Sequence, residues 1–167
     1  MSDKSNNWKK AQALMNQAEY HINQGNTEVA LGLANEAVSI AESSGIDPFN
    51  LKISREMMLI AGSKKPDFSG VITVMKETLA IYLQENENIP QIIDLLINLA
   101  GFLLKTNSLQ EALHYLDQAE GLLKSTTADE ISHQLPRNRL LTGSKFVSHK
   151  LADVDRLRKY IEGTESP

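Results

Sequence analysis

The sequence is constrained above all by a helical pattern that returns at a fixed interval of 41 residues. One position early in a helix is occupied in turn by Ala30, Val71 and Ala112. Seven residues further on, the same interval separates a second set: Ala37, Thr78 and Ala119. A polar turn precedes each set, and the apolar residues around it recur at the three- and four-residue spacing of amphipathic helices. Equal intervals of this kind predict repeated helical hairpins that bury their apolar faces by stacking.

The clearest copy of the unit covers residues 95–124, where two amphipathic patterns flank the polar break 105–108. Glycine, asparagine, proline and polar clusters mark the other boundaries. We therefore expect an all-α chain whose first four helices cover the ranges 8–24, 28–43 with a cap at Thr27, 48–61 and 68–84. The fifth helix should run from Pro90 to the polar break, and the sixth should follow the break and end near Ser125. A single repeat domain is expected over 8–162, with disordered termini at 1–7 and 163–167.

The C-terminal part of the pattern is weaker. Thr127 and Glu130 fit a capping box that opens a seventh helix. Pro136 falls inside this pattern, so the helix either starts there or is kinked there. An eighth helix is expected over 151–162. Its charged face should point outward, as suits the end of a stack, and comprises Lys150, Asp153, Arg156 and Lys159.

The composition and the absence of several motifs exclude some classes of function. The chain has no cysteine, which excludes disulfides, thiol nucleophiles and cysteine-bound zinc. The polar N-terminus, and the lack of an apolar run of about 20 residues, lead us to expect a cytoplasmic protein without a membrane segment. The four histidines lack metal-site spacing, and neither a phosphate-binding loop nor a nucleophile elbow is present. We therefore expect a non-enzymatic protein without a metal or a cofactor.

Charge is distributed unevenly. Residues 1–131 hold ten Lys and Arg against seventeen Asp and Glu, whereas residues 132–160 hold seven against two. A solvated or internally paired basic face explains this better than an acidic partner or nucleic acid does, so nucleic acid is not expected.

The pattern resembles the tetratricopeptide repeat (TPR) family. The third hairpin carries the resemblance best, through Leu96, Leu99, Ala100, Leu109, Ala112, Leu116 and Ala119. The first hairpin keeps it through Leu14, Ala18, Gly25, Ala30, Ala34 and Ala37. The 41-residue interval is similar to the longer-helix variants in kinesin light chains and bacterial peptide-sensing regulators. The resemblance implies a right-handed superhelical solenoid of about four antiparallel hairpins, which binds proteins or peptides in a concave groove lined by first helices.

Residues one interval apart on the first helices should form rows across that groove. The expected groove residues are Gln12, Met15, Asn16, Glu19, Glu56, Met57, Asp94, Ile97, Asn98, Asn138 and Arg139. Asparagine amides can pair with an extended peptide backbone, and methionine and isoleucine add apolar contact. Ordinary packing between helices explains Ile53, Ile60 and Ile97 equally well.

The acidic members of this set make the N-terminal and central groove negative. Some TPR domains hold a chaperone's C-terminal carboxylates, but Glu19 and Asp94 would repel such a ligand here.

The expected function is a scaffold or adaptor that binds a protein or peptide. Two alternatives stay open: a cytosolic chaperone for a secreted or unstable partner, and a structural protein that self-associates into a homo-oligomer. A third reading, an enzyme or nucleic-acid binder, would use the basic C-terminal residues Arg137, Arg139, Lys145 and His149.

Overall fold

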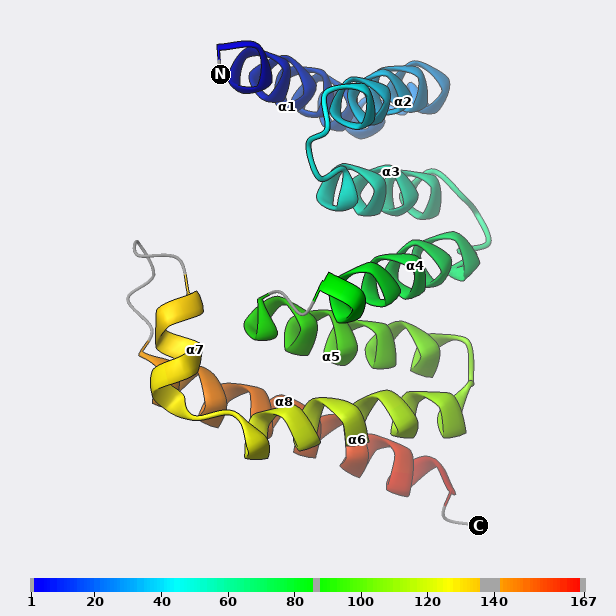
Figure 1. Ribbon diagram of the computed structural model, residues 1–167. Helices are drawn as coiled ribbons and strands as arrows, with labels where there is room; N and C mark the ends of the chain where they lie inside the picture. The colour runs from blue at the N-terminus through cyan, green and yellow to red at the C-terminus, as the bar shows by residue number, and fades with distance from the viewer. Residues whose placement is uncertain (1, 86–87, 136–141, 166–167) are drawn as a thin grey trace. The chain divides into compact units, whose positions relative to one another are not determined.

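The computed structural model describes residues 2–85, 88–135 and 142–165, which form eight α-helices and no strand (Figure 1). This confirms the all-α class. The first four helices are α1 (Ser2–Asn23), α2 (Thr27–Ser43), α3 (Phe49–Ala61) and α4 (Ser69–Glu85). The other four are α5 (Ile89–Lys105), α6 (Leu109–Ser125), α7 (Ala128–Gln134) and α8 (Gly143–Glu165).

Contacts gather the chain into two compact units, whereas the sequence predicts one repeat domain. Unit 1 is Met1–Val74 and unit 2 is Met75–Pro167. The division falls within α4, which belongs to the hairpin whose repeat positions carry Val71 and Thr78 in place of alanine.

The two best hairpins, α1–α2 in unit 1 and α5–α6 in unit 2, turn in the same way. Gly25 and Asn107 both have positive φ, at 78° and 58°. The next amide donates back to the helix in each turn, from Asn26 to the carbonyl of His21 and from Ser108 to that of Leu103, at 2.9 Å in both. This hydrogen-bond pattern is that of a Schellman helix end. The repeated polar turn of the sequence is therefore a repeated backbone structure.

In unit 1, α1 packs on α2 and α3 packs on both. The first-hairpin repeat positions Ala30 and Ala37 are fully buried. Because alanine is small, the helix backbones can approach closely. The core around them contains Ala11, Met15, Ala18, Ala34, Val38, Ala41, Leu51 and Met58.

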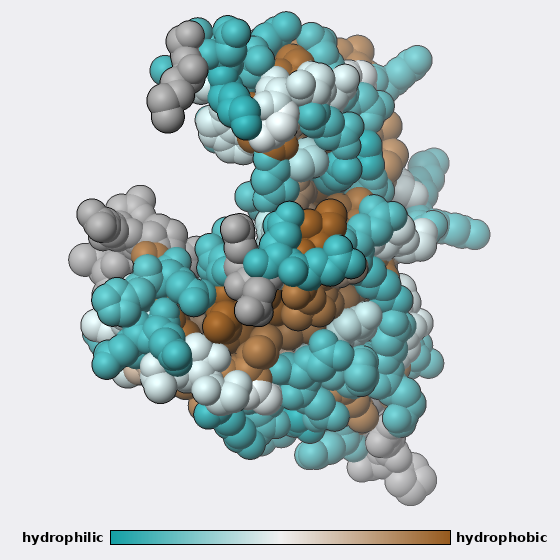
Figure 2. Space-filling view, in the orientation of Figure 1, coloured by the Kyte–Doolittle hydropathy of each residue, from teal (hydrophilic) through white to brown (hydrophobic). Residues whose placement is uncertain are grey.

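In unit 2, α5 is the central helix and contacts α6, α7 and α8. Hydrophobic side chains cover most of its circumference, and Figure 2 shows apolar surface gathered over this helix. Asn88 caps its first turn by accepting from the amide of Gln91. A helix that is apolar on most sides must be covered by several neighbours, which explains why α8 returns to lie against it.

The C-terminal helices differ from those predicted. The predicted capping box is confirmed, since Thr127 N–H donates to Glu130 Oε2 at 2.8 Å and Glu130 N–H donates to Thr127 Oγ1 at 3.2 Å. However, α7 ends at Gln134, before Pro136, which itself lies outside the described residues. The next helix begins at Gly143, eight residues before the predicted start at Leu151.

A close approach between α7 and α8 explains that early start. The amide of Gly143 donates to Ser132 Oγ at 2.8 Å. A side chain at this glycine would collide with the backbone carbonyl of Ala128. The contact depends on tertiary packing, and the sequence around Gly143 has no apolar periodicity from which this helix start could be predicted.

Helix α8 has two buried residues at the spacing expected for a fourth copy of the sequence pattern. Val154 and Ile161 are almost fully buried and lie seven residues apart, as Ala112 and Ala119 do in α6. The step from Ala112 to Val154 is 42 residues, one more than the earlier steps.

Residues 2–7 and 163–165, which we predicted to be disordered, are helical, and residues 1, 166 and 167 lie outside the described part of the chain. Helix α1 already begins at Ser2, and Lys4 and Asn7 explain why. Lys4 Nζ donates to the carbonyl of Gly45 at 3.1 Å, and Asn7 Nδ2 donates to Ser44 Oγ at 2.9 Å. At the other end, α8 extends to Glu165 rather than ending at 162.

Candidate functional site

A cleft of about 360 Å³ opens between α5 and α8 in unit 2. We call it the α5–α8 cleft. Its lining comprises Ile97, Asn98, Gly101, Phe102 and Lys105 from α5 with Lys150, Asp153, Arg156 and Leu157 from α8. Two of the residues that the sequence places in the groove, Ile97 and Asn98, therefore lie in a real concavity.

The α5 wall offers a polar group and free space side by side. Asn98 is exposed, so its amide can donate and accept. One helical turn later, a methyl group at Gly101 would meet no atom within 4 Å. Ile97 is only 6% exposed, so its side chain serves mainly as packing. The wall thus combines a hydrogen-bonding group, an apolar base and room for a ligand atom.

An ion pair joins the two walls. Lys150 Nζ of α8 lies 2.7 Å from Asp94 Oδ1 of α5. The same carboxylate oxygen has no partner with hydrogen-bond geometry, so the contact is mainly a charge interaction. Lys150 also lies over the ring of Phe146, 5.7 Å from its centroid. These contacts correct one expectation: Asp94 does not give the cleft a free negative charge.

The α8 wall carries a short charged row. Arg156 Nη2 donates to Asp153 Oδ1 at 2.9 Å, and the second oxygen of Asp153 is 3.8 Å from Lys150 Nζ. On the opposite wall, Lys105 Nζ lies 5.4 Å from the ring centroid of Phe102. The lining therefore has three cations and one carboxylate. The face of α8 that the sequence assigns to solvent forms half of the cleft instead.

A second set of charges fixes α8 to α6. Arg158 Nη2 donates to Asp117 Oδ1 and, at 2.8 Å, to Glu120 Oε2. A hydrogen bond from Lys124, with the nearby charges of Lys124 and Arg158, lowers the pKa of the Glu120 carboxyl. Helix α8 is thus held by ion pairs to α5 on one side of the cleft and to α6 beyond it.

The predicted groove residues of unit 1 are placed differently. Gln12, Asn16 and Glu19 are exposed on α1. Met15 is only 5% exposed and belongs to the core of unit 1, so it offers little surface to a partner. Met57 on α3 is 40% exposed.

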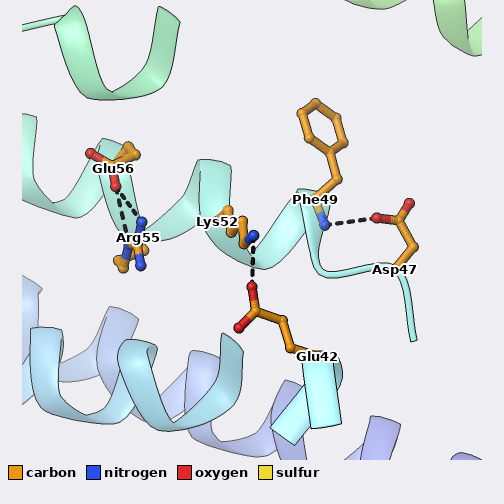
Figure 3. A network of polar contacts seen from close by, with 6 residues as sticks. All are labelled: Glu42, Asp47, Phe49, Lys52, Arg55 and Glu56. Atoms are coloured by element: carbon orange, nitrogen blue, oxygen red, sulfur yellow. Dashed lines mark hydrogen bonds and ion pairs between the residues drawn. The ribbon is translucent and has the colours of Figure 1, made fainter. Parts of the chain in front are cut away.

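Glu56 is occupied by local contacts (Figure 3). Its Oε1 accepts from Arg55 Nη2 at 2.7 Å. Its other oxygen lies against the backbone of Gly70 in the first turn of α4, where a side chain would collide with it. A carboxylate near a helix N-terminus is stabilised by the helix dipole. A neighbouring pair, Lys52 and Glu42 at 2.7 Å, ties α3 to α2.

Asn138 and Arg139 lie outside the described residues. The remaining groove residues are divided between the two units, so the rows that join them stay predictions. Sequence reasoning missed most of the cleft: Phe102, Lys105, Lys150, Asp153, Arg156 and Leu157. The sequence feature that could have indicated the α8 side of the cleft is the row of charged residues at three-residue spacing, which we assigned to a solvent-facing side of the helix.

These features define an all-helical, repeat-like protein with a cleft between two helices. Comparisons with protein-family models, curated proteins and solved structures find no match to the chain. Within the described residues, no group of three His, Asp or Glu side chains is arranged to hold a metal ion. No helix in that part of the chain has the length and apolarity needed to cross a membrane.

Proposed function

We propose that this chain is a non-enzymatic cytoplasmic scaffold that binds a protein or peptide segment, and that its helices form a TPR-like right-handed solenoid. The repeated Schellman turns at Gly25 and Asn107 support the repeat. The buried positions Ala30, Val71, Ala112 and Val154 support it independently.

The α5–α8 cleft is the observation that carries the binding function. An extended segment has unpaired backbone amides and carbonyls, and the exposed Asn98 amide can pair with both. The open space at Gly101 admits the segment's backbone or a small side chain. Phe102 and Leu157 are half-buried and supply apolar contact. The ion pair between Lys150 and Asp94 holds the walls in place before binding, which lowers the entropy cost of association.

A steric block of the cleft tests this proposal. Gly101→Leu places a side chain in the cleft, whereas Gly121→Leu places the same side chain on α6, outside the cleft lining. Both glycines are within helices and have open space around the position of a β-carbon. The tagged full chain and both variants are used to retain partners from the native cell extract, after circular dichroism has shown that each variant is folded.

We expect one set of partners to be retained by the wild type and by Gly121→Leu and to be lost from Gly101→Leu. Asn98→Ala is a second cleft variant, used in case Gly101→Leu does not fold: it removes the hydrogen-bonding amide and adds no bulk. Equal retention by the wild type and the cleft variants would show that the function does not use this cleft.

A further inference from the structure

The α5–α8 cleft contains a carboxylate of its own in a position that a ligand carboxylate could take. Asp153 lies between two cations, 2.9 Å from Arg156 Nη2 and 3.8 Å from Lys150 Nζ. Lys150 already has a shorter contact with Asp94. Asp153 is therefore the main described partner of Arg156, whose side chain is 74% exposed.

The pair between Asp153 and Arg156 is one that a ligand can replace at small cost. The two residues are three positions apart on one helix, and pairs with this much exposure contribute little to stability. The contact uses a single guanidinium nitrogen, Nη2. An external carboxylate can instead meet the planar guanidinium through two parallel hydrogen bonds, which are stronger and more specific.

We propose that Asp153 is a built-in stand-in for an acidic side chain of the partner, and that the cleft binds an extended segment carrying Asp or Glu next to an apolar residue. This inference rests on the proposed function and names the chemistry of its ligand. On binding, the ligand carboxylate takes the place of Asp153 at Arg156. Lys105, on the opposite wall, adds positive charge along the same cleft.

The geometry also determines which segments are rejected. A basic segment would meet Lys105 and Arg156 and be repelled, because the three cations of the lining outnumber Asp153 and the Asp94 carboxylate that pairs with Lys150. A wholly polar acidic segment would gain the charge contact and lose the apolar contact with Phe102 and Leu157.

A library of random heptapeptides displayed on phage tests the inference before any natural partner is identified. The folded full chain is the target, and the enriched peptides are then synthesised with a fluorescent label. Their affinities are measured by anisotropy for the wild type, Asp153→Asn and Arg156→Ala. Lys159→Ala is the matched control, since it removes a positive charge from an exposed part of α8 outside the cleft lining.

We expect enriched peptides to contain Asp or Glu beside an apolar residue. Asp153→Asn should tighten their binding by about two- to fivefold, because it removes a competing exposed ion pair. Arg156→Ala should weaken binding by at least a similar factor, and Lys159→Ala should change it much less. Raised salt should reduce the differences between variants, since exposed charges are screened.

Other outcomes separate this inference from the proposed function. Enriched peptides that are basic, or that bind Asp153→Asn more weakly than the wild type, overturn the inference. If Gly101→Leu still abolishes their binding, the cleft remains a peptide site with a different ligand. A selection that yields no binder contradicts both the inference and the proposed function.

Discussion

Lys150 of α8 and Asp94 of α5 form a 2.7 Å ion pair across the two helices that bound the cleft. Both side chains are partly exposed, at 25% and 30%, so solvent screens the pair only in part. We expect a double-mutant cycle with Lys150→Ala and Asp94→Ala to give a coupling of about 1 kcal/mol in urea unfolding, the upper end of the range for exposed pairs. The pair between Lys76 and Glu111, at 39% and 41% exposed, should give a smaller value. A coupling near zero at Lys150 would show that α8 is held by other contacts.

The repeat positions give a prediction about packing. Ala112 has no exposed surface at the start of α6. Ala112→Leu should lower the free energy of unfolding by about 1–3 kcal/mol, because added methylenes find no space. The exposed neighbour Gln110 is the control, and Gln110→Ala should change stability by no more than about 0.5 kcal/mol. Equal losses in the two variants would mean that the predicted helix crossing is not at this position.

Substitution of two helical glycines should raise the free energy of unfolding, whereas Ala112→Leu should lower it. A methyl group at Gly101 or Gly121 meets nothing within 4 Å, and glycine within a helix costs about 0.5–1 kcal/mol relative to alanine. Gly101→Ala and Gly121→Ala should therefore each raise the unfolding free energy by about that amount. Gly143→Ala should lower it, because the carbonyl of Ala128 occupies the required space. Stabilisation by Gly143→Ala would contradict the close approach of α7 and α8.

Acid should weaken the start of α7. Hydrogen bonds from the Thr127 amide and hydroxyl lower the pKa of Glu130 from its ordinary value of 4.5. A carboxyl whose pKa falls on folding stabilises the fold above its unfolded pKa and loses that contribution as pH falls through the folded pKa. Glu130→Gln keeps an acceptor for the capping box but cannot ionise. The wild type's advantage over this variant should be full at about pH 7 and should shrink progressively as the pH is lowered below the ordinary value of 4.5. An advantage that stays constant as the pH is lowered through this range would contradict the assignment.

Local chemistry explains which helices could be predicted from sequence. The predicted end of α2 at Ser43 matches the structure, and its start differs by one residue: Thr27, predicted as the cap, is the first residue of the helix, and Asn26 takes the cap position. The Gly25–Asn26 turn before it and the Ser44–Gly45 break after it each require a backbone conformation that few residues adopt. The capping box of Thr127 and Glu130 could be predicted for the same reason, because it is formed by residues close together in the sequence.

The cleft depends on packing that local patterns do not encode. The charges of α8 at 150, 153 and 156 have the spacing of any solvated helix face. They face α5 because α8 starts early at Gly143 and because α5 is apolar on most sides. The sequence could place Asn98 on the first helix of a hairpin but could not show that α8 would lie beside it.

The central claim, that unit 2 binds its partner in the α5–α8 cleft, is tested most directly at Asn98. The affinity of the purified partner, or of a selected peptide, should fall several-fold to a hundredfold in Asn98→Ala, since an unpaired buried polar group costs about 1–3 kcal/mol. Asn35→Ala, at an exposed asparagine on α2, should leave the affinity unchanged. If Asn98→Ala binds as tightly as the wild type while His114→Ala, on the exposed face of α6, abolishes binding, the partner uses that face and the cleft is not the site.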